Sequence, residues 1–313
     1  METAQTSDAS GDPASPDPEP VTTRARRVPM ALVTWAFVLL VLLIVVVLLV
    51  VKITRGSTTL PPAPVTPAPA QVVHAATSVS ASVFDEVGTP QAEPAPSVLS
   101  GQPPLVLGGR PGVVYVGGDF CPYCAAERWA LVVALGRFGT FSGLASTSSS
   151  TFEVFPRTDT FSFQGSSYRS RYLSFSATEE YGESPSSDAP AGFPGLEKPT
   201  PLEQTLVKRY GDTSSGSSSG DSDAAATLPF VDVGNRLAIT GAEVGFSPAV
   251  LQGDSMGQIA GDLSSATNPV TVAIVGAANE ITSAICAVDG RDPKGVCQST
   301  GVQAAAARLG LGA

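Results

Sequence analysis

The chain has 313 residues, which allows one or two folded domains, and its composition is 43% hydrophobic but only 15% charged. The formal net charge of −10 arises after residue 55, where 23 acidic residues face 13 basic ones, so a basic nucleic-acid-binding face is excluded. His74 is the only histidine and lies in a Pro-rich stretch, which excludes sites built on a histidine base or on histidine metal ligands.

The first predicted element is a membrane-spanning helix. Residues Val28 to Val51 are 24 consecutive uncharged positions dominated by Val and Leu. A helix of that length extends about 36 Å at roughly 1.5 Å per residue, enough to cross a bilayer with some tilt. A cleaved signal peptide has a shorter apolar region of about 7 to 15 residues. We therefore expect residues 28–51 to be a retained anchor in the lipid bilayer.

The basic residues that flank this segment predict its orientation. Three arginines precede the helix, and two basic residues follow it: Arg24, Arg26, Arg27, Lys52 and Arg55. The excess on the N-terminal side favours a cytoplasmic N-terminus. We therefore expect a single-pass protein of the cell membrane, with residues 1–27 as a disordered cytoplasmic tail and the large domain outside the cell.

A Pro-rich stalk is predicted after the anchor, over residues 52–76. Ser57 to Gln71 contain five prolines, which favour an extended polyproline conformation with roughly 45 Å of reach. The extracytoplasmic domain is predicted over residues 77–300, with its core beginning near Leu105, and residues 301–313 are predicted as a C-terminal tail.

The first recognisable unit of this domain is a strand followed by a C-x-x-C motif and a helix. Gly112 to Val116 are β-branched and aromatic and lead into a Gly-Gly turn, which is typical of a short buried strand. The segment CPYCAAERWALVVAL then begins at Cys121 and ends before Gly136. Pro at the first helical position and Gly just past the end are typical of an α-helix.

The remaining elements alternate between strands and helices, which predicts an α/β fold. The predicted strands are 141–144, 161–164, 172–176, 229–233 and 237–240, and the predicted helices are 201–210, 255–263 and 270–285. Residues 211–226 are rich in Ser and Gly and are predicted to be a flexible loop.

The chemistry predicted for Cys121 and Cys124 follows from their position at a helix start. Unpaired N–H groups and the helix dipole favour an anion there, so we expect a lowered pKa for the Cys121 thiol and a nucleophilic role for it. Cys124, three residues later, is placed to resolve a mixed disulfide formed at Cys121. This chemistry needs no cofactor and no metal.

Other interpretations of the four cysteines stay open. Cys121 and Cys124 could form an inert bridge or half of a zinc site, although C-x-x-C with C-x10-C fits a four-cysteine zinc site badly. Cys286 and Cys297 are predicted to form a structural disulfide worth about 3 kcal/mol, with a second redox pair as the alternative.

The order of these elements resembles the thioredoxin superfamily. It consists of a strand, C-P-Y-C, a helix, then Thr227-Leu228-Pro229-Phe230 entering a strand pair, and a last helix. The resemblance implies a thioredoxin-like mixed sheet with flanking helices and inserted strands. It also implies a cis peptide before Pro229, with Pro229 against the cysteines and the Leu228 backbone docking the substrate chain. The run C-P-Y-C-A-A-E-R-W more closely resembles a membrane-anchored family known only as domain of unknown function 929.

The chain departs from that superfamily in two respects. Thioredoxins place a buried acid in the strand before the motif, and Gly112 to Val116 hold none. Asp119 and Glu127 are the candidates for a proton relay, although a turn residue and a solvated helix-face residue are the simpler interpretations. Cys124 and Pro229 are also far apart in sequence, which predicts that part of residues 141–210 is an added subdomain or lid. Trp129 and Phe138 are predicted core residues.

These patterns together predict a membrane-anchored, extracytoplasmic thiol-disulfide oxidoreductase whose partners are client proteins that carry thiols or disulfides. The hypothesis requires a Cys121 sulfur that is exposed at the surface, where clients can reach it. A noncatalytic thioredoxin-like binding or scaffolding domain is the main alternative, and redox partnering in copper or haem maturation is a specialised version of the first hypothesis.

Overall fold

A computed structural model of the chain describes Trp35 and residues 37–47, 65–89, 95–187, 192–211, 228–243 and 245–311. The chain divides into two units, Met1–Pro61 and Pro62–Ala313, which we describe separately. The predicted tail 1–27, residues 52–64 of the predicted stalk, and residues 212–226 of the predicted loop lie outside the described residues.

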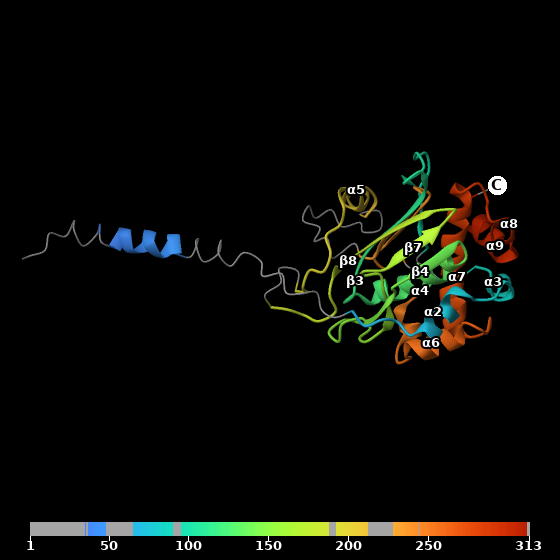
Figure 1. Cartoon of the computed structure of the whole chain (residues 1–313), viewed down its shortest axis with the longest axis horizontal. Coiled ribbons are helices and arrows are strands. Elements are labelled where there is room, and N and C mark those ends of the chain that lie inside the picture. The colour runs from blue at the N-terminus through green and yellow to red at the C-terminus, as the bar shows by residue number, and fades with distance from the viewer. Residues whose placement is uncertain are drawn as a thin grey trace, which may run out of the picture. The chain divides into compact units, whose positions relative to one another are not determined.

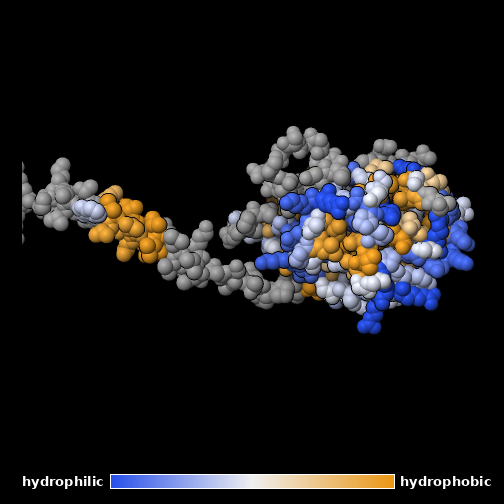
Figure 2. Space-filling view, turned by 90° about the horizontal axis from the view of Figure 1, so that it is seen from above, coloured by the Kyte–Doolittle hydropathy of each residue, from blue (hydrophilic) through white to orange (hydrophobic). Residues whose placement is uncertain are grey.

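In the first unit the structure describes part of the predicted anchor. Phe37–Val47 form an apolar helix, and Figure 2 shows its apolar surface. Its large side chains are exposed, as is that of Trp35. The rest of the predicted span 28–51 lies outside the described residues. One helix of the described chain is by itself long and apolar enough to cross a membrane, Pro269–Val288, but it is a core helix, 83% buried inside the second unit.

Helices and strands of the second unit follow one another in mixed order (Figure 1). The helices are α2 (Ala70–Thr77), α3 (Ala81–Val87), α4 (Pro122–Gly136), α5 (Pro201–Tyr210), the 3-10 helix η2 (Pro248–Leu251), α6 (Met256–Asp262), α7 (Pro269–Val288), α8 (Lys294–Cys297) and α9 (Thr300–Leu309). The strands are β1 (Ser97–Val98), β2 (Val106–Leu107), β3 (Arg110–Gly118), β4 (Gly139–Ser142), β5 (Ala145–Ser148), β6 (Asp159–Ser162), β7 (Ser167–Ser170), β8 (Ser174–Tyr181), β9 (Phe230–Val233) and β10 (Leu237–Thr240).

Strand β3 is the centre of a six-stranded mixed sheet. Its parallel neighbour is β8 and its antiparallel neighbour is β9, with Tyr115 opposite both Ala177 and Val231. Beyond β9 lie β10 and β1, and β2 pairs with the first residues of β3. Two small antiparallel pairs, β4 with β7 and β5 with β6, lie outside this sheet. The predicted mixed α/β architecture with flanking helices is confirmed.

The two faces of the sheet bury different side chains, because successive residues of a strand point to opposite faces. Val113 and Tyr115 of β3 belong to a large apolar cluster that also contains the core residues of α4 and α7. Val114 and Val116 belong to a second, smaller cluster that contains Cys121. The cysteine motif, which follows β3 in the chain, therefore belongs to the smaller of the two apolar layers.

Most predicted elements match the structure within a few residues. Helix α4 ends at Gly136, α5 spans the predicted residues, and Asn268 caps α7 by accepting the N–H of Val270. Strands β9 and β10 lie where they were predicted. Trp129 and Phe138 are core residues, as predicted.

The end of the predicted stalk differs from the structure. Residues 65–68 already pair with the fold, since the Ala68 N–H donates to the Leu144 carbonyl oxygen at 2.9 Å. Pro69 caps α2, whose side chains Val72 and Ala76 are buried. The stretch that follows Pro69 contains no proline and alternates apolar residues at helical spacing, so it packs as a helix instead of continuing the polyproline segment.

The predicted C-terminal tail is also part of the core. Alanine-rich α9 buries Val302 and Ala305 and packs against α3 and α7. Alanine is the strongest helix former, which explains why residues 300–309 form a helix although they contain few large apolar side chains. In the same layer, the Asn279 side chain donates to the carbonyl oxygens of Phe84 at 2.9 Å and Gly88 at 2.6 Å. The two ends of the second unit therefore meet on α7.

The substitution Phe84→Ala tests whether the segment before residue 90 belongs to the core. The Phe84 ring is 2% exposed and lies 3.9 Å below the Arg137 guanidinium. Its loss should lower the free energy of unfolding by about 3–5 kcal/mol. Urea unfolding of the full chain in detergent, followed by near-ultraviolet circular dichroism, measures this change.

The matched control is Phe152→Ala, which removes a ring that is 80% exposed. We expect this control to stay within about 0.5 kcal/mol of the unsubstituted chain. Equal, small effects of both substitutions would contradict the assignment of α3 to the core.

Candidate functional site

Cys121 occupies the N-cap of α4. Its backbone is extended there, with φ −82° and ψ 123°, and Pro122 occupies the first turn, where its missing N–H costs nothing. The Cys121 Sγ accepts the N–H of Cys124 at 3.2 Å. The sulfur thus takes the place of the oxygen of a usual capping side chain, which is the position where a helix favours an anion.

A residue distant in sequence completes this site. The Cys121 thiol donates to the carbonyl oxygen of Leu228 at 3.8 Å. The peptide bond between Leu228 and Pro229 is cis, and Pro229 leads directly into β9. The structure therefore brings together the four residues that the sequence singled out for redox chemistry and substrate docking.

The two thiols have opposite pKa shifts. Burial raises the pKa of the Cys121 thiol, but hydrogen bonds from Cys124 and the positive charge of Arg128 outweigh burial and leave this pKa below its ordinary value. Burial raises the pKa of the Cys124 thiol well above its ordinary value, and the neighbouring Cys121 raises it further. Cys121 is thus the better thiolate of the pair.

The expected open exposure of Cys121 is wrong. Cys121 is only 6% exposed, and Cys124 is fully buried. Both cysteines lie in the smaller apolar cluster, which we call the dithiol cluster. Its members are Leu105, Val114, Val116, Phe120, Cys121, Cys124, Leu206, Tyr210, Leu228, Phe230 and Ala238. Leu206 and Tyr210 come from α5, on the face of the sheet opposite α4 and α7 (Figure 1). The sequence predicted α5 but gave no sign of which face it covers.

A buried arginine beneath the motif was missed at the sequence level. Arg128 follows Cys124 by one helical turn, so both project from the same side of α4. Its side chain is fully buried, and one of its terminal nitrogens, Nη1, lies 2.9 Å from Glu179, 3.1 Å from the Tyr115 hydroxyl and 3.3 Å from the Gly118 carbonyl oxygen. In the sequence, Arg128 stands in a run of Ala, Glu and Trp, and nothing in that run distinguishes a buried, paired arginine from one on the surface.

The positive charge of this arginine acts on both thiols. It lowers the pKa of Cys121 and opposes the rise at Cys124. Burial raises the pKa of the Glu179 carboxyl, and the guanidinium of Arg128 opposes that rise. The Arg128–Glu179 pair therefore fixes one positive charge under the start of α4.

Asp119 is the outer partner of this buried network. It is 7% exposed and lies 3.5 Å from Arg128. Burial raises the pKa of Asp119, while Arg128 lowers it. Its carboxylate is thus two residues from Cys121 in sequence and shares a cation with the network that acts on the thiols.

Glu127 is not a solvated helix-face residue. It is fully buried, and neither of its carboxyl oxygens has a hydrogen-bond partner in the described part of the chain. Burial raises its pKa well above the ordinary value, and the nearby Glu280 of α7 raises it further. Glu280 is therefore the charged residue that acts on Glu127. Glu280 itself forms an ion pair with Arg308 of α9. Helix α4 is buried around most of its circumference, so the predicted solvent-exposed face that would carry Glu127 is wrong.

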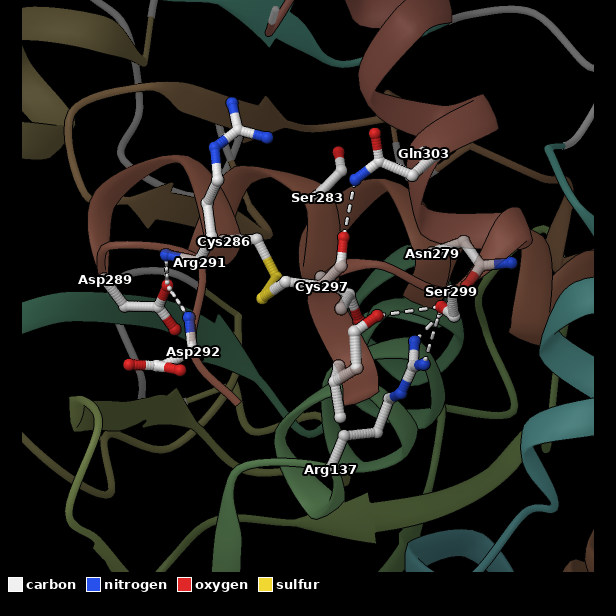
Figure 3. The surroundings of a disulfide bond; sticks show 12 residues. Arg137, Asn279, Ser283, Cys286, Asp289, Arg291, Asp292, Cys297, Ser299 and Gln303 are labelled. Carbon is white, nitrogen blue, oxygen red and sulfur yellow. Dashed lines mark hydrogen bonds between the residues drawn. A yellow bond between two sulfur atoms is a disulfide. The ribbon is translucent and has the colours of Figure 1, made fainter. Parts of the chain in front are cut away.

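The other two cysteines form a disulfide that joins the end of α7 to α8 (Figure 3). Asp289 accepts the backbone N–H of Arg291 at 2.9 Å, and the Gln303 side chain donates to the Cys297 carbonyl oxygen at 2.6 Å. Asp289 and the two sulfurs lie within 4.8 Å of one another. Because the sulfurs are bonded to each other and lie in the large apolar cluster, the four cysteines form two separate pairs.

Comparison with known proteins identifies one family. A family model described as a domain of unknown function (DUF929) matches residues 99–287, more than half of the chain. No curated protein and no solved structure matches it. The matched range contains both cysteines of the motif, Leu228, Pro229 and Cys286, and it ends before Cys297.

The double substitution Arg128→Met with Glu179→Gln tests the electrostatic role of the buried pair. Removing both charges avoids leaving one of them unpaired in the core. We expect the pKa of the Cys121 thiol to rise, since a cation that favours the thiolate is lost. The thiolate would then disappear at a higher pH than in the unsubstituted chain, which the ultraviolet absorbance of the thiolate measures without requiring access to the sulfur.

Glu127→Gln is the control, since it changes a buried carboxyl on the same helix, keeps both Arg128 and Glu179, and should leave the thiol pKa unchanged. A thiol pKa that is the same with and without Arg128 would remove the arginine from any account of the chemistry.

Glu127→Gln tests the buried carboxyl. A carboxyl whose pKa is raised by folding contributes its full stabilisation at pH values below its pKa in the unfolded chain. This contribution is lost as the pH rises through its pKa in the folded chain. The unsubstituted chain should therefore lose stability as the pH rises above the ordinary pKa range of a glutamate carboxyl, and Glu127→Gln should flatten that slope. Urea unfolding at several pH values measures it. The exposed Glu86→Gln is the control, and identical slopes for the two variants would show that Glu127 does not titrate in this range.

Proposed function

The chain belongs to the family described as a domain of unknown function (DUF929), whose name assigns no activity, and we propose from its cysteine geometry that it is a thiol-disulfide oxidoreductase. The observation that carries the proposal is the placement of Cys121. Its sulfur caps α4, accepts the Cys124 N–H and contacts the Leu228 carbonyl oxygen next to Pro229.

The proposed reaction is thiol-disulfide exchange in two steps. The Cys121 thiolate attacks one sulfur of a client disulfide, and the other client sulfur leaves with the bonding electrons and takes up a proton. Cys124 then loses its proton and attacks Cys121, which releases the second client thiol and leaves a Cys121–Cys124 disulfide. The client gains two electrons and two protons, and the reverse sequence oxidises a client dithiol. The high pKa of Cys124 fits a resolving thiol that reacts second.

A thioredoxin-like fold is part of the proposal. Its support is the order of elements along the chain: strand β3, the C-P-Y-C motif, helix α4, then the cis Leu228–Pro229 peptide, the strand pair β9–β10 and the long helix α7. The pairing of β3 with both β8 and β9 also fits this arrangement. On this interpretation, β4 to β7 are the added strands between Cys124 and Pro229.

We also propose that residues 28–51 anchor the protein in the cell membrane, with the N-terminus in the cytoplasm and the redox pair outside. The support is the length of the uncharged segment, the arginines before it and the exposed apolar helix Phe37–Val47 within it. The Cys286–Cys297 disulfide fits this location, because disulfides persist in oxidising compartments. The clients would be exported proteins with thiols or disulfides.

One observation favours a noncatalytic binding domain instead. Cys121 is 6% exposed, and α5 contributes two side chains to the cluster that surrounds it. A domain that only binds a partner does not need an accessible Cys121 sulfur, so the side chains of the dithiol cluster could stay in place. For an oxidoreductase, the same packing requires that a client reach the sulfur past the dithiol cluster, which makes access a controlled step.

The substitution Cys124→Ala distinguishes the two functions. Without the resolving thiol, the mixed disulfide formed at Cys121 cannot be released, so covalent complexes with client proteins should accumulate. Non-reducing electrophoresis of the full chain from membranes, followed by mass spectrometry of the linked proteins, detects them. They should disappear on reduction.

The control is the double substitution Cys121→Ser with Cys124→Ala, which should trap nothing. Lack of any trapped species under several oxidants, together with a normal thiolate signal for Cys121, would favour the noncatalytic domain.

A further inference from the structure

An exposed apolar loop lies next to the cysteine motif. We call residues 149–157, which connect β5 to β6, the Phe152 loop. Phe152 is 80% exposed and Val154 is 77% exposed, the highest exposures among the large apolar side chains described in the second unit. Single exposed apolar residues are common, but two at the tip of one loop form a small apolar surface.

The base of this loop is held by hydrogen bonds. The Ser149 hydroxyl donates to the Phe155 carbonyl oxygen at 2.7 Å and accepts the Thr158 N–H at 2.9 Å. The Gln252 side chain donates to the Pro156 carbonyl oxygen at 3.0 Å. These contacts fix the two ends of the loop, so its tip presents apolar side chains from an ordered frame.

The loop is continuous with the candidate site. The Ser150 N–H donates to the carbonyl oxygen of Phe120 at 2.8 Å, immediately before Cys121. The Phe155 ring packs edge-on against Tyr123, with ring centroids 6.1 Å apart. Tyr123 lies between the two cysteines in the motif. A chain bound at the cysteines would therefore lie beside the tip of the Phe152 loop.

We propose that the Phe152 loop docks an extended client segment by contacting an apolar side chain close to the reacting client cysteine. This inference rests on the proposed function and adds a preference among clients. A contact with Phe152 and Val154 would stabilise the mixed disulfide with any client that has an apolar side chain near its cysteine, whatever the rest of the client sequence. Such a contact is weak and reversible, which suits a surface that must release its client after each exchange.

The charge and size of the loop argue for a client chain over other occupants. The loop carries one acidic residue, Glu153, and one basic residue, Arg157, and the chain after residue 55 is strongly acidic, so an anionic bilayer is electrostatically unfavourable. A stable dimer interface buries roughly 1,600 Å² in total, far more than two side chains provide. A single apolar client side chain matches the size of the tip.

The experiment uses the full chain in detergent with Cys124→Ala and compares two probes. One is the symmetric disulfide dimer of a short peptide with a phenylalanine beside its cysteine, so that attack on either sulfur releases the same peptide thiol, and the other is oxidised glutathione, which has no apolar side chain. Adding Phe152→Ser and Val154→Ser should slow formation of the mixed disulfide with the peptide roughly tenfold, the loss expected for about 1.4 kcal/mol of apolar contact. The rate with glutathione should not change.

The matched control is Val272→Ser, at a partly exposed position on α7, which should leave both rates unchanged. Equal slowing of both probes by the loop variant, or no slowing of either, would overturn the docking inference and leave the oxidoreductase standing. If the chain without loop substitutions reacts with neither probe, the proposed function fails, and the inference that rests on it fails too.

Two other outcomes also overturn the inference. Loss of dimers in the loop variant, measured by sedimentation, would identify the tip as a self-association surface. Loss of binding to vesicles with anionic lipid would identify it as a membrane contact.

Discussion

The buried guanidinium of Arg128 is the interaction on which the cysteine site depends. It connects α4 to the end of β3 through the Gly118 carbonyl oxygen and to β8 through Glu179, and it places a fixed positive charge under both thiols. An unpaired charge at this depth would be strongly destabilising, so the pairing with Glu179 is a condition for the fold as well as for the chemistry. Helix start, sheet register and thiol ionisation are thereby coupled through one side chain.

Packing explains why the cysteine pair is both polarised and concealed. The capping position and Arg128 favour a thiolate at Cys121, whereas the apolar side chains around it disfavour any charge. The balance leaves Cys121 acidic relative to Cys124. In a pair arranged in this way, apolar side chains cover the more acidic of the two thiols.

Local patterns were sufficient to predict the elements around the motif. The run from Cys121 to Gly136 carries its own start and stop signals, and the strands β9 and β10 are marked by Pro229 and a Gly turn. The sequence could not show what covers each face, because burial depends on contacts between distant segments. Glu127 and Arg128 are adjacent in sequence, yet one meets Glu280 on α7 and the other meets Glu179 on β8, a distinction that only the tertiary structure makes. The stalk was predicted too long for a related reason, since proline content ends at Pro69 but the packing of α2 does not depend on proline.

The meeting of both chain ends on α7 has a consequence for biosynthesis. Asn279 of α7 donates to the backbone of Phe84, and the Gly301 N–H of α9 donates to Asp85 at 3.0 Å, so α3 acquires these partners only after α7 and α9 exist. During synthesis from the N-terminal end, α3 must therefore wait, partly uncovered, until α9 has been made. Closure of this layer is a late event, and a nascent chain that stalls before α9 would present the apolar side chains of α3 to chaperones and proteases.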